Sequence, residues 1–113
     1  MPCIQMSTNQ TVSEEKKETL KTRFGQAIEL IPGKSEKWLM CVFHPTCEMW
    51  FQGRQERLAF LEVGIYGQPE KESLNQLTGE LMQIVSSELD ISKEHIYIKY
   101  AMTPCWGWNG KNF

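Results

Sequence analysis

The chain has 113 residues, a length at which a single domain buries roughly 65% of the surface that its unfolded chain exposes. Its 12 basic and 14 acidic side chains are interspersed and give a formal net charge of −2, so we expect neither a nucleic acid nor a membrane as a partner. The sequence has no apolar run of membrane-spanning length and no start typical of a signal peptide. We therefore expect one domain over residues 1–113 in a soluble, cytoplasmic protein, with secretion by another route left open.

The first half of the chain predicts a strand followed by a helix. Residues 2–8 are typical of a strand, and Thr11 or Ser13 can cap the N-terminus of the helix. Apolar residues then recur every three or four positions, as expected for one buried helix face: Leu20, Phe24, Ala27, Ile28 and Ile31. Pro32-Gly33 predicts the end of this helix.

Four further segments extend this pattern. The nearly continuous apolar run over residues 38–43 is typical of a strand buried on both faces, and residues 49–51 predict a short strand fragment. Residues 58–66 and 96–100 predict two more strands. Between them, apolar residues at helical spacing predict a second helix: Leu74, Leu77, Leu81, Ile84, Val85 and Leu89.

The two halves therefore share one plan of strand, helix and strand, offset by roughly 57 residues. Helix-linked strands favour parallel pairing, so two such βαβ units predict an α/β (α+β) fold, with a four-stranded mixed sheet and both helices on one face. The other face of the sheet is left uncovered. Residues 38–43 are apolar at odd and even positions alike, so apolar side chains would face both sides of the sheet. We therefore expect a second copy of the chain to cover the face without helices.

The end of the chain is unusually aromatic, and such side chains favour burial or a pocket wall. Five motifs occur in order along the sequence: Pro2 after Met1, PGK at 32–34, MWFQG at 49–53, ISKEHIYIKY at 91–100 and GWNGKNF at 107–113. With these motifs the whole chain resembles the macrophage migration inhibitory factor family of the tautomerase superfamily. The similarity is greater to microbial and protozoan members than to the vertebrate cytokine.

The resemblance implies a homotrimer with pockets at the subunit interfaces and a cofactor-independent keto–enol tautomerase. Its substrates would be aryl α-keto acids such as phenylpyruvate, and dopachrome-type compounds in addition. Pro2 would be the general base, because removal of Met1 converts its backbone nitrogen into a free secondary amine. No metal is required, since hydrogen bonds can stabilise the enol oxygen.

The resemblance also assigns substrate-binding residues. Lys34 would lower the pKa of the Pro2 amine and bind the substrate carboxylate. Tyr66 would contribute its backbone amide, and Tyr97 would reach the pocket from a neighbouring subunit. Aromatic residues would form apolar pocket walls or trimer contacts: Trp38, Trp106, Trp108 and Phe113. Without the resemblance, Pro2 simply begins an edge strand, Lys34 is a solvated lysine and the aromatic residues are ordinary packing residues.

Three departures from the vertebrate pattern bear on these assignments. Lys99 replaces an asparagine that contacts ligand, so it would strengthen carboxylate binding, lower the pKa of the base further, or face solvent. Trp106 replaces a small aliphatic residue and would narrow the pocket. Leu58 and Leu61 occupy the positions of a cysteine pair associated with thiol–disulfide oxidoreductase activity, so we do not expect that activity.

The four cysteines are too sparse for a disulfide scaffold, so we expect them to be small apolar residues in a reducing compartment. Cys41, His44 and Cys47 have a spacing that resembles a zinc site. Residues 41 and 44 nevertheless face opposite sides of a strand, so we expect no metal.

Two other functions are compatible with the sequence. One is a cytokine-like secreted protein that engages a host receptor and keeps only a vestigial or modulatory pocket. The other is a trimeric scaffold without activity. Pro2 together with Lys34 favours the enzyme.

Overall fold

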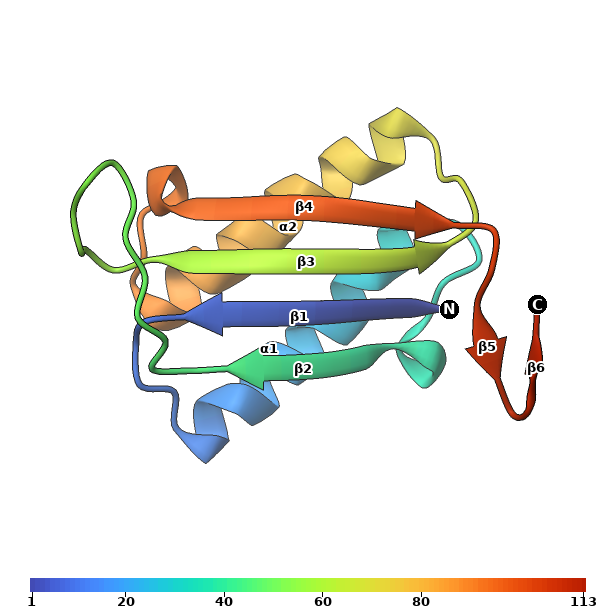
Figure 1. Ribbon diagram of the computed structural model, residues 1–113, viewed down its shortest axis with the longest axis horizontal. Coiled ribbons are helices and arrows are strands. Elements are labelled where there is room, and N and C mark those ends of the chain that lie inside the picture. The colour runs from blue at the N-terminus through green and yellow to red at the C-terminus, as the bar shows by residue number, and fades with distance from the viewer.

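The computed structural model describes all 113 residues and contains a four-stranded sheet with two helices on one face (Figure 1). The strands of this sheet are β1 (Pro2–Thr8), β2 (Met40–His44), β3 (Ala59–Tyr66) and β4 (Ile96–Thr103). The helices are α1 (Glu14–Ala27) and α2 (Lys71–Leu89), with the short 3-10 helices η1 (Ile28–Leu30), η2 (Glu36–Trp38) and η3 (Lys93–His95). A separate hairpin pairs β5 (Gly107–Trp108) with β6 (Lys111–Asn112).

The strand order is β2-β1-β3-β4. The outer pairs, β1 with β2 and β3 with β4, are parallel, whereas the central strands β1 and β3 are antiparallel. This arrangement confirms the predicted mixed sheet of two βαβ units with both helices on one face. Pro2 pairs with Ile65, so the chain begins beside the end of β3.

Local sequence signals account for most element boundaries. The Ser13 hydroxyl accepts a hydrogen bond from the Lys16 backbone N–H at 3.1 Å and so caps α1. The helix ends at Ala27, and η1 tightens the chain before the turn at Pro32-Gly33. This ending is several residues earlier than the apolar pattern predicts, because a 3-10 turn also keeps Ile28 buried.

Two predicted strand segments differ from the structure. Trp38 belongs to η2, and β2 begins only at Met40. Residues 49–51 form no strand, and Phe51 makes only an isolated bridge to Arg54. The run over residues 38–43 therefore combines a 3-10 turn with an edge strand, which explains its continuous apolar character without burial on both faces.

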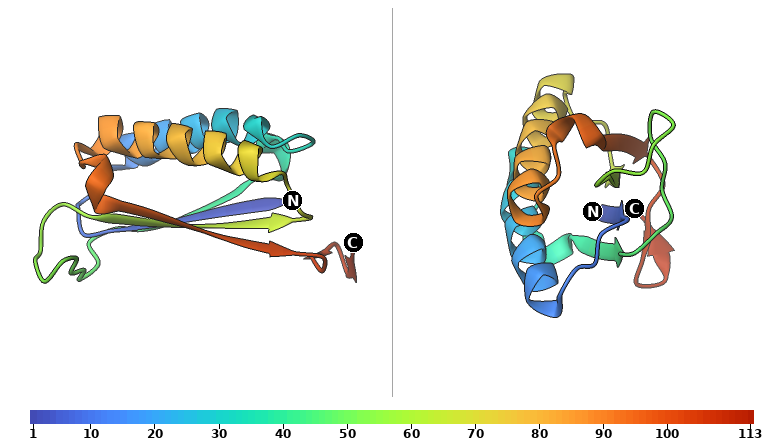
Figure 2. Two further views of the ribbon diagram at one scale, coloured as in Figure 1. Left: turned by 90° about the horizontal axis from the view of Figure 1, so that it is seen from above. Right: turned by 90° about the vertical axis from the view of Figure 1, so that its left-hand side faces the viewer.

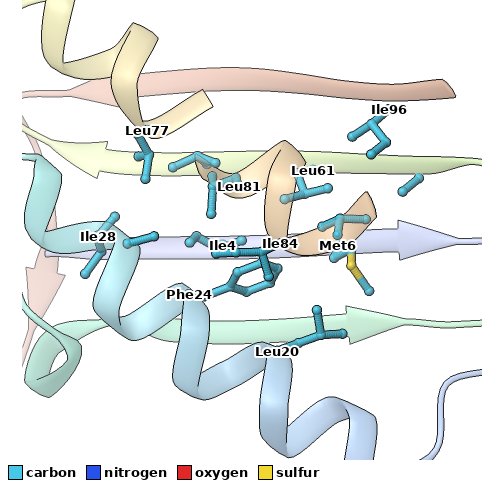
Figure 3. Close-up of a cluster of buried hydrophobic side chains, with 14 of the residues drawn as sticks. Ile4, Met6, Leu20, Phe24, Ile28, Leu61, Leu77, Leu81, Ile84 and Ile96 are labelled. Atoms are coloured by element: carbon cyan, nitrogen blue, oxygen red, sulfur yellow. The ribbon is translucent and has the colours of Figure 1, made fainter. Parts of the chain in front are cut away.

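The core lies between the sheet and the helices (Figure 3). Alternate residues of the central strands face the helices, and the apolar stripes of α1 and α2 cover them. Fully buried members include Ile4, Met6, Leu20, Phe24, Leu61, Leu77, Leu81 and Ile84. At the helix surface, Glu88 of α2 binds Arg23 at 2.8 Å and Lys16 at 3.1 Å, both from α1. The hydrogen bonds from Arg23 and Lys16 lower the pKa of the Glu88 carboxyl.

The opposite face of the sheet carries no helix and mixes polar side chains with apolar ones such as Val42, Phe60 and Tyr97, so it is less uniformly apolar than predicted. Here Glu62 binds Lys99 at 3.1 Å, and His44 lies 3.5 Å from the Gln5 side chain. The apolar residues of β2 alternate between the two faces, and Met40 is 64% exposed. No helix is long and apolar enough to cross a membrane.

Candidate active site

The chain begins at the end of the sheet from which the C-terminal hairpin extends. Figure 2 shows the hairpin on the side of the sheet away from the helices, near the start of β1. At this end β1 starts, β3 finishes at Tyr66 and β4 finishes at Thr103. Segments from both halves of the sequence therefore meet around the buried Pro2.

Tyr66 links the N-terminus to Lys34 through its backbone. Its N–H donates a hydrogen bond to the Met1 carbonyl oxygen at 3.0 Å, and its own carbonyl oxygen accepts one from Lys34 Nζ at 2.8 Å. Lys34 reaches this point because Gly33, at φ 83°, turns the chain directly before it. The structure thus brings together three elements that the sequence separates by about 30 residues each.

The electrostatic setting of the N-terminus favours a neutral amine. The pKa of the Met1 amine is lowered from 8.0 to about 6, chiefly because burial disfavours the ammonium form. The hydrogen bond and positive charge of Lys34 lower this pKa further. An amine at this place is therefore available as a base at neutral pH.

Four aromatic side chains, which we call the aromatic cluster, form an arc beside Lys34: Trp38, Tyr66, Trp108 and Phe113. Trp38 meets Trp108 edge to face with their ring centroids 5.0 Å apart, and Trp108 stacks on Phe113 at 6.0 Å. Phe113 lies 6.3 Å from Tyr66, whose ring centroid is 5.8 Å from Lys34 Nζ. The cluster thus gives an apolar surface that ends at a cation.

The hairpin places two of these aromatic residues. Asn109 and Gly110 both have positive φ, at 53° and 85°, as a two-residue hairpin turn requires. The Phe113 N–H then donates to the Trp106 carbonyl oxygen at 2.9 Å. This hydrogen bond closes the hairpin, so Trp108 and Phe113 belong to one paired unit.

Trp106 lies against the open face of the sheet, over Gly64. Its ring atoms come within 3.7 Å of the place that a Cβ on Gly64 would occupy. Gly64 pairs with Cys3, the residue after Pro2. Sequence analysis missed Gly64, although a glycine inside a predicted strand is a signal for a close approach of this kind.

Tyr97 and Lys99 lie apart from Pro2 within one chain. Tyr97 is near the start of β4, is 61% exposed and meets the Phe51 ring at 4.9 Å between centroids. It helps to line an apolar cavity of about 300 Å³ with Met49, Trp50, Phe51, Leu58, Ala59, Phe60 and His95. Lys99 is bound to Glu62 on the open face. The structure therefore joins Pro2, Lys34, Trp106 and the aromatic cluster, and leaves Tyr97 and Lys99 outside that group.

A second cavity, of about 340 Å³, lies directly at Lys34. Its walls come from the turn after η1 and from the segment between β3 and α2: Ile31, Pro32, Lys34, Tyr66, Gly67, Gln68, Pro69 and Glu70. Lys34 therefore faces an open space rather than a filled core.

The cysteine and histidine residues form no comparable site. Cys41 and His44 lie on opposite faces of β2, since they are an odd number of residues apart in a strand. No group of three His, Cys, Asp or Glu side chains is placed to hold a metal ion, and all four cysteines are free thiols.

Comparison with known proteins gives the family. The sequence model of the macrophage migration inhibitory factor family matches residues 1–113, and the chain belongs to that family. Among curated proteins, none matches the chain in sequence.

Solved structures agree with this assignment over the whole length. The structure of Leishmania major MIF2 is 27% identical in sequence and has a TM-score of 0.94, with 100% of this chain and 97% of that chain covered. A macrophage migration inhibitory factor homologue from Prochlorococcus marinus is 25% identical with a TM-score of 0.89, and 98% of each chain is covered. The protein Pt0534, solved after inactivation by 2-oxo-3-pentynoate, shares the fold at 18% identity and a TM-score of 0.85, with 96% and 93% covered.

Proposed function

We propose that this protein is a cofactor-independent keto–enol tautomerase of aryl α-keto acids such as phenylpyruvate, with dopachrome-type compounds as further substrates. Pro2 is the general base after removal of Met1. The observation that carries the proposal is the meeting of the N-terminus with Lys34 at the backbone of Tyr66. Membership of the macrophage migration inhibitory factor family supports it.

Removal of Met1 would change two groups at once. The nitrogen of Pro2 becomes a basic secondary amine, whereas in the peptide bond it is neither basic nor nucleophilic. The Tyr66 N–H loses its acceptor, because that acceptor is the Met1 carbonyl oxygen. A base and a free hydrogen-bond donor then lie side by side at the mouth of the site.

These two groups match the needs of keto–enol exchange. The Pro2 nitrogen takes the proton from the carbon next to the substrate ketone, and the electrons of that C–H bond form the C=C bond of the enolate. The Tyr66 N–H donates to the negative oxygen, which then takes the proton from the Pro2 ammonium and becomes the enol. The reaction only moves a proton, so this chain's own groups can complete it.

Lys34 and the aromatic cluster orient the substrate in this proposal. The Lys34 ammonium binds the carboxylate, and its charge also keeps the pKa of the neighbouring amine low. The aryl ring of the substrate lies against Trp108 and Phe113, which the hairpin holds in contact. Trp106 limits the space on the side of the open sheet face.

The proposal includes a homotrimer in which Tyr97 reaches the site of a neighbouring subunit, and in which Lys99 approaches the same site. Proteins of this family are typically trimers. The exposed Tyr97 and the apolar cavity around it support a contact surface at that end of the sheet. Light scattering tests this part, because a monomer would leave Tyr97 far from any Pro2.

The test combines intact mass with turnover of phenylpyruvate. We expect the purified protein to lack Met1 and to be active, and the variant Pro2→Gly to lose about 10²–10⁴-fold in kcat/KM. An alanine inserted between Met1 and Pro2 is the matched control, since it retains the proline ring but places its nitrogen in a peptide bond. Equal activity of all three proteins would refute Pro2 as the base, and an inactive protein with a free Pro2 would refute the proposed activity.

A further inference from the structure

A second lysine lies at the far end of the aromatic cluster. Lys37 Nζ is 5.1 Å from the ring centroid of Trp38, while Lys34 Nζ is 5.8 Å from that of Tyr66 at the other end. The rings between them are in continuous contact, with centroid distances from 5.0 to 6.3 Å. The arc of aromatic surface thus has a cation at each end.

Neither cation is neutralised by a neighbouring acid. Lys34 and Lys37 form no ion pair, in contrast to Lys16, Lys17, Lys21 and Lys99. The adjacent Glu36 carboxylate lies against α1 at Gly25, so it does not pair with Lys37. Glu70 lines the cavity at Lys34, but it likewise forms no ion pair with that lysine.

We propose that Lys37 selects substrates that carry a second anionic group at the end remote from the α-keto acid, such as an aryl α-keto acid with a carboxylate on its ring. This inference rests on the proposed function, because it assumes that the first carboxylate is bound by Lys34. The ring then lies along Phe113 and Trp108, and its far substituent arrives at Trp38, beside Lys37. A neutral substituent there would gain no charge interaction.

The chemistry favours a dianion over a single acid of the same shape. An exposed carboxylate–lysine pair strengthens binding by up to about fivefold, and the effect weakens as salt screens it. Between the two lysines, Trp108 and Phe113 stack with only 24° between their ring planes, so a planar aryl group suits this pair better than a flexible chain. Lys37 is solvent-exposed, so its substitution leaves the core intact.

The experiment compares two unreactive planar ligands by calorimetric titration of the mature protein. We expect 4-carboxycinnamate to bind about three- to fivefold more tightly than cinnamate at low ionic strength, with the ratio falling at high salt. In Lys37→Gln the ratio should fall to about one, and Lys37→Glu should favour cinnamate. Lys93→Gln, at an exposed lysine in η3, is the matched control and should keep the wild-type ratio.

The outcomes separate this inference from the proposed function. A ratio of one in the wild type, a ratio unaffected by Lys37→Gln, or no binding of either ligand would overturn the inference. Turnover of phenylpyruvate by the same wild-type sample is measured in parallel. If the protein prefers the dianion but does not convert phenylpyruvate, this inference about Lys37 stands and the proposed tautomerase activity is refuted.

Discussion

The substitution Lys34→Gln tests whether Lys34 keeps the N-terminal amine neutral at physiological pH, and so available as a base, and whether it binds the substrate carboxylate. Lys34 donates to the Tyr66 carbonyl oxygen at 2.8 Å, and its hydrogen bond and charge help to lower the pKa of the N-terminal amine. Glutamine retains a hydrogen-bonding side chain and removes the charge. We therefore expect the amine to become more basic and the substrate carboxylate to lose its partner.

The structure sets the size of both effects. Lys34 supplies two of the three causes of the fall in the Met1 amine pKa from 8.0 to about 6, and burial supplies the third and largest, so loss of Lys34 should raise this pKa only part of the way back towards 8.0. At pH 7 the neutral fraction, about 90% for a pKa of about 6, would therefore fall, and the rate would fall with it by less than about tenfold. Loss of a charged hydrogen bond to the carboxylate costs a further 1.5–3 kcal/mol or about 10–100-fold in kcat/KM, mainly through KM.

The assay is kcat/KM for phenylpyruvate measured from acidic to alkaline pH. A base must be deprotonated to act, so a higher amine pKa should move the acidic limb of the profile of Lys34→Gln to higher pH. Lys93→Gln, at an exposed lysine in η3, should overlay the wild type. An acidic limb at the wild-type pH together with an unchanged KM would refute the role that we assign to Lys34.

Three further predictions concern stability and are measured by denaturant unfolding. Leu81→Ala should cost about 2–5 kcal/mol, because the fully buried side chain leaves a cavity under α2, and a cost below about 1 kcal/mol would contradict this packing. Thr8→Val should cost about 1–3 kcal/mol, because it removes the hydrogen bond that the buried hydroxyl donates to the Leu58 carbonyl oxygen at 2.7 Å. A neutral effect on the free energy of unfolding would contradict this role of the hydroxyl. Glu88→Gln should cost less than about 1 kcal/mol at pH 7, because the pairing with Arg23 is partly solvated. The lowered Glu88 pKa means that this stabilisation is present at neutral pH and disappears as the pH falls through the pKa of the carboxyl, so a difference that persists in acid would contradict it.

The fold was largely predictable because its signals are local. The cap at Ser13, the turn at Pro32-Gly33 and the helical spacing in α2 each act within a few residues. The prediction was wrong at residues 38–39 and 49–51, where a 3-10 turn and an irregular loop have the same apolar composition as strands, although residues 40–43 do lie in β2. The C-terminal hairpin was missed, although the positive φ of its turn suits the Asn-Gly sequence at 109–110.

The candidate site depends on contacts that no local pattern specifies. Lys34 and Tyr66 are 32 residues apart, and their hydrogen bond forms only because the sheet places the end of β3 beside the turn after η1. The contact of Trp106 with Gly64 likewise joins the tail to a central strand. Only the family resemblance pointed to Lys34 from the sequence, and nothing there indicated that Lys37 would lie on Trp38 at the edge of the same aromatic cluster.

The central claim is that Pro2 carries a free amine whose basicity the fold reduces. A ¹⁵N NMR titration of protein labelled at proline measures this directly, because an amine nitrogen titrates and an imide nitrogen does not. The account predicts a Pro2 nitrogen with a pKa clearly below the range of about 7.7–8.0 that is ordinary for an α-amine. A Pro2 nitrogen that does not titrate, or that titrates within or above that range, would contradict the account.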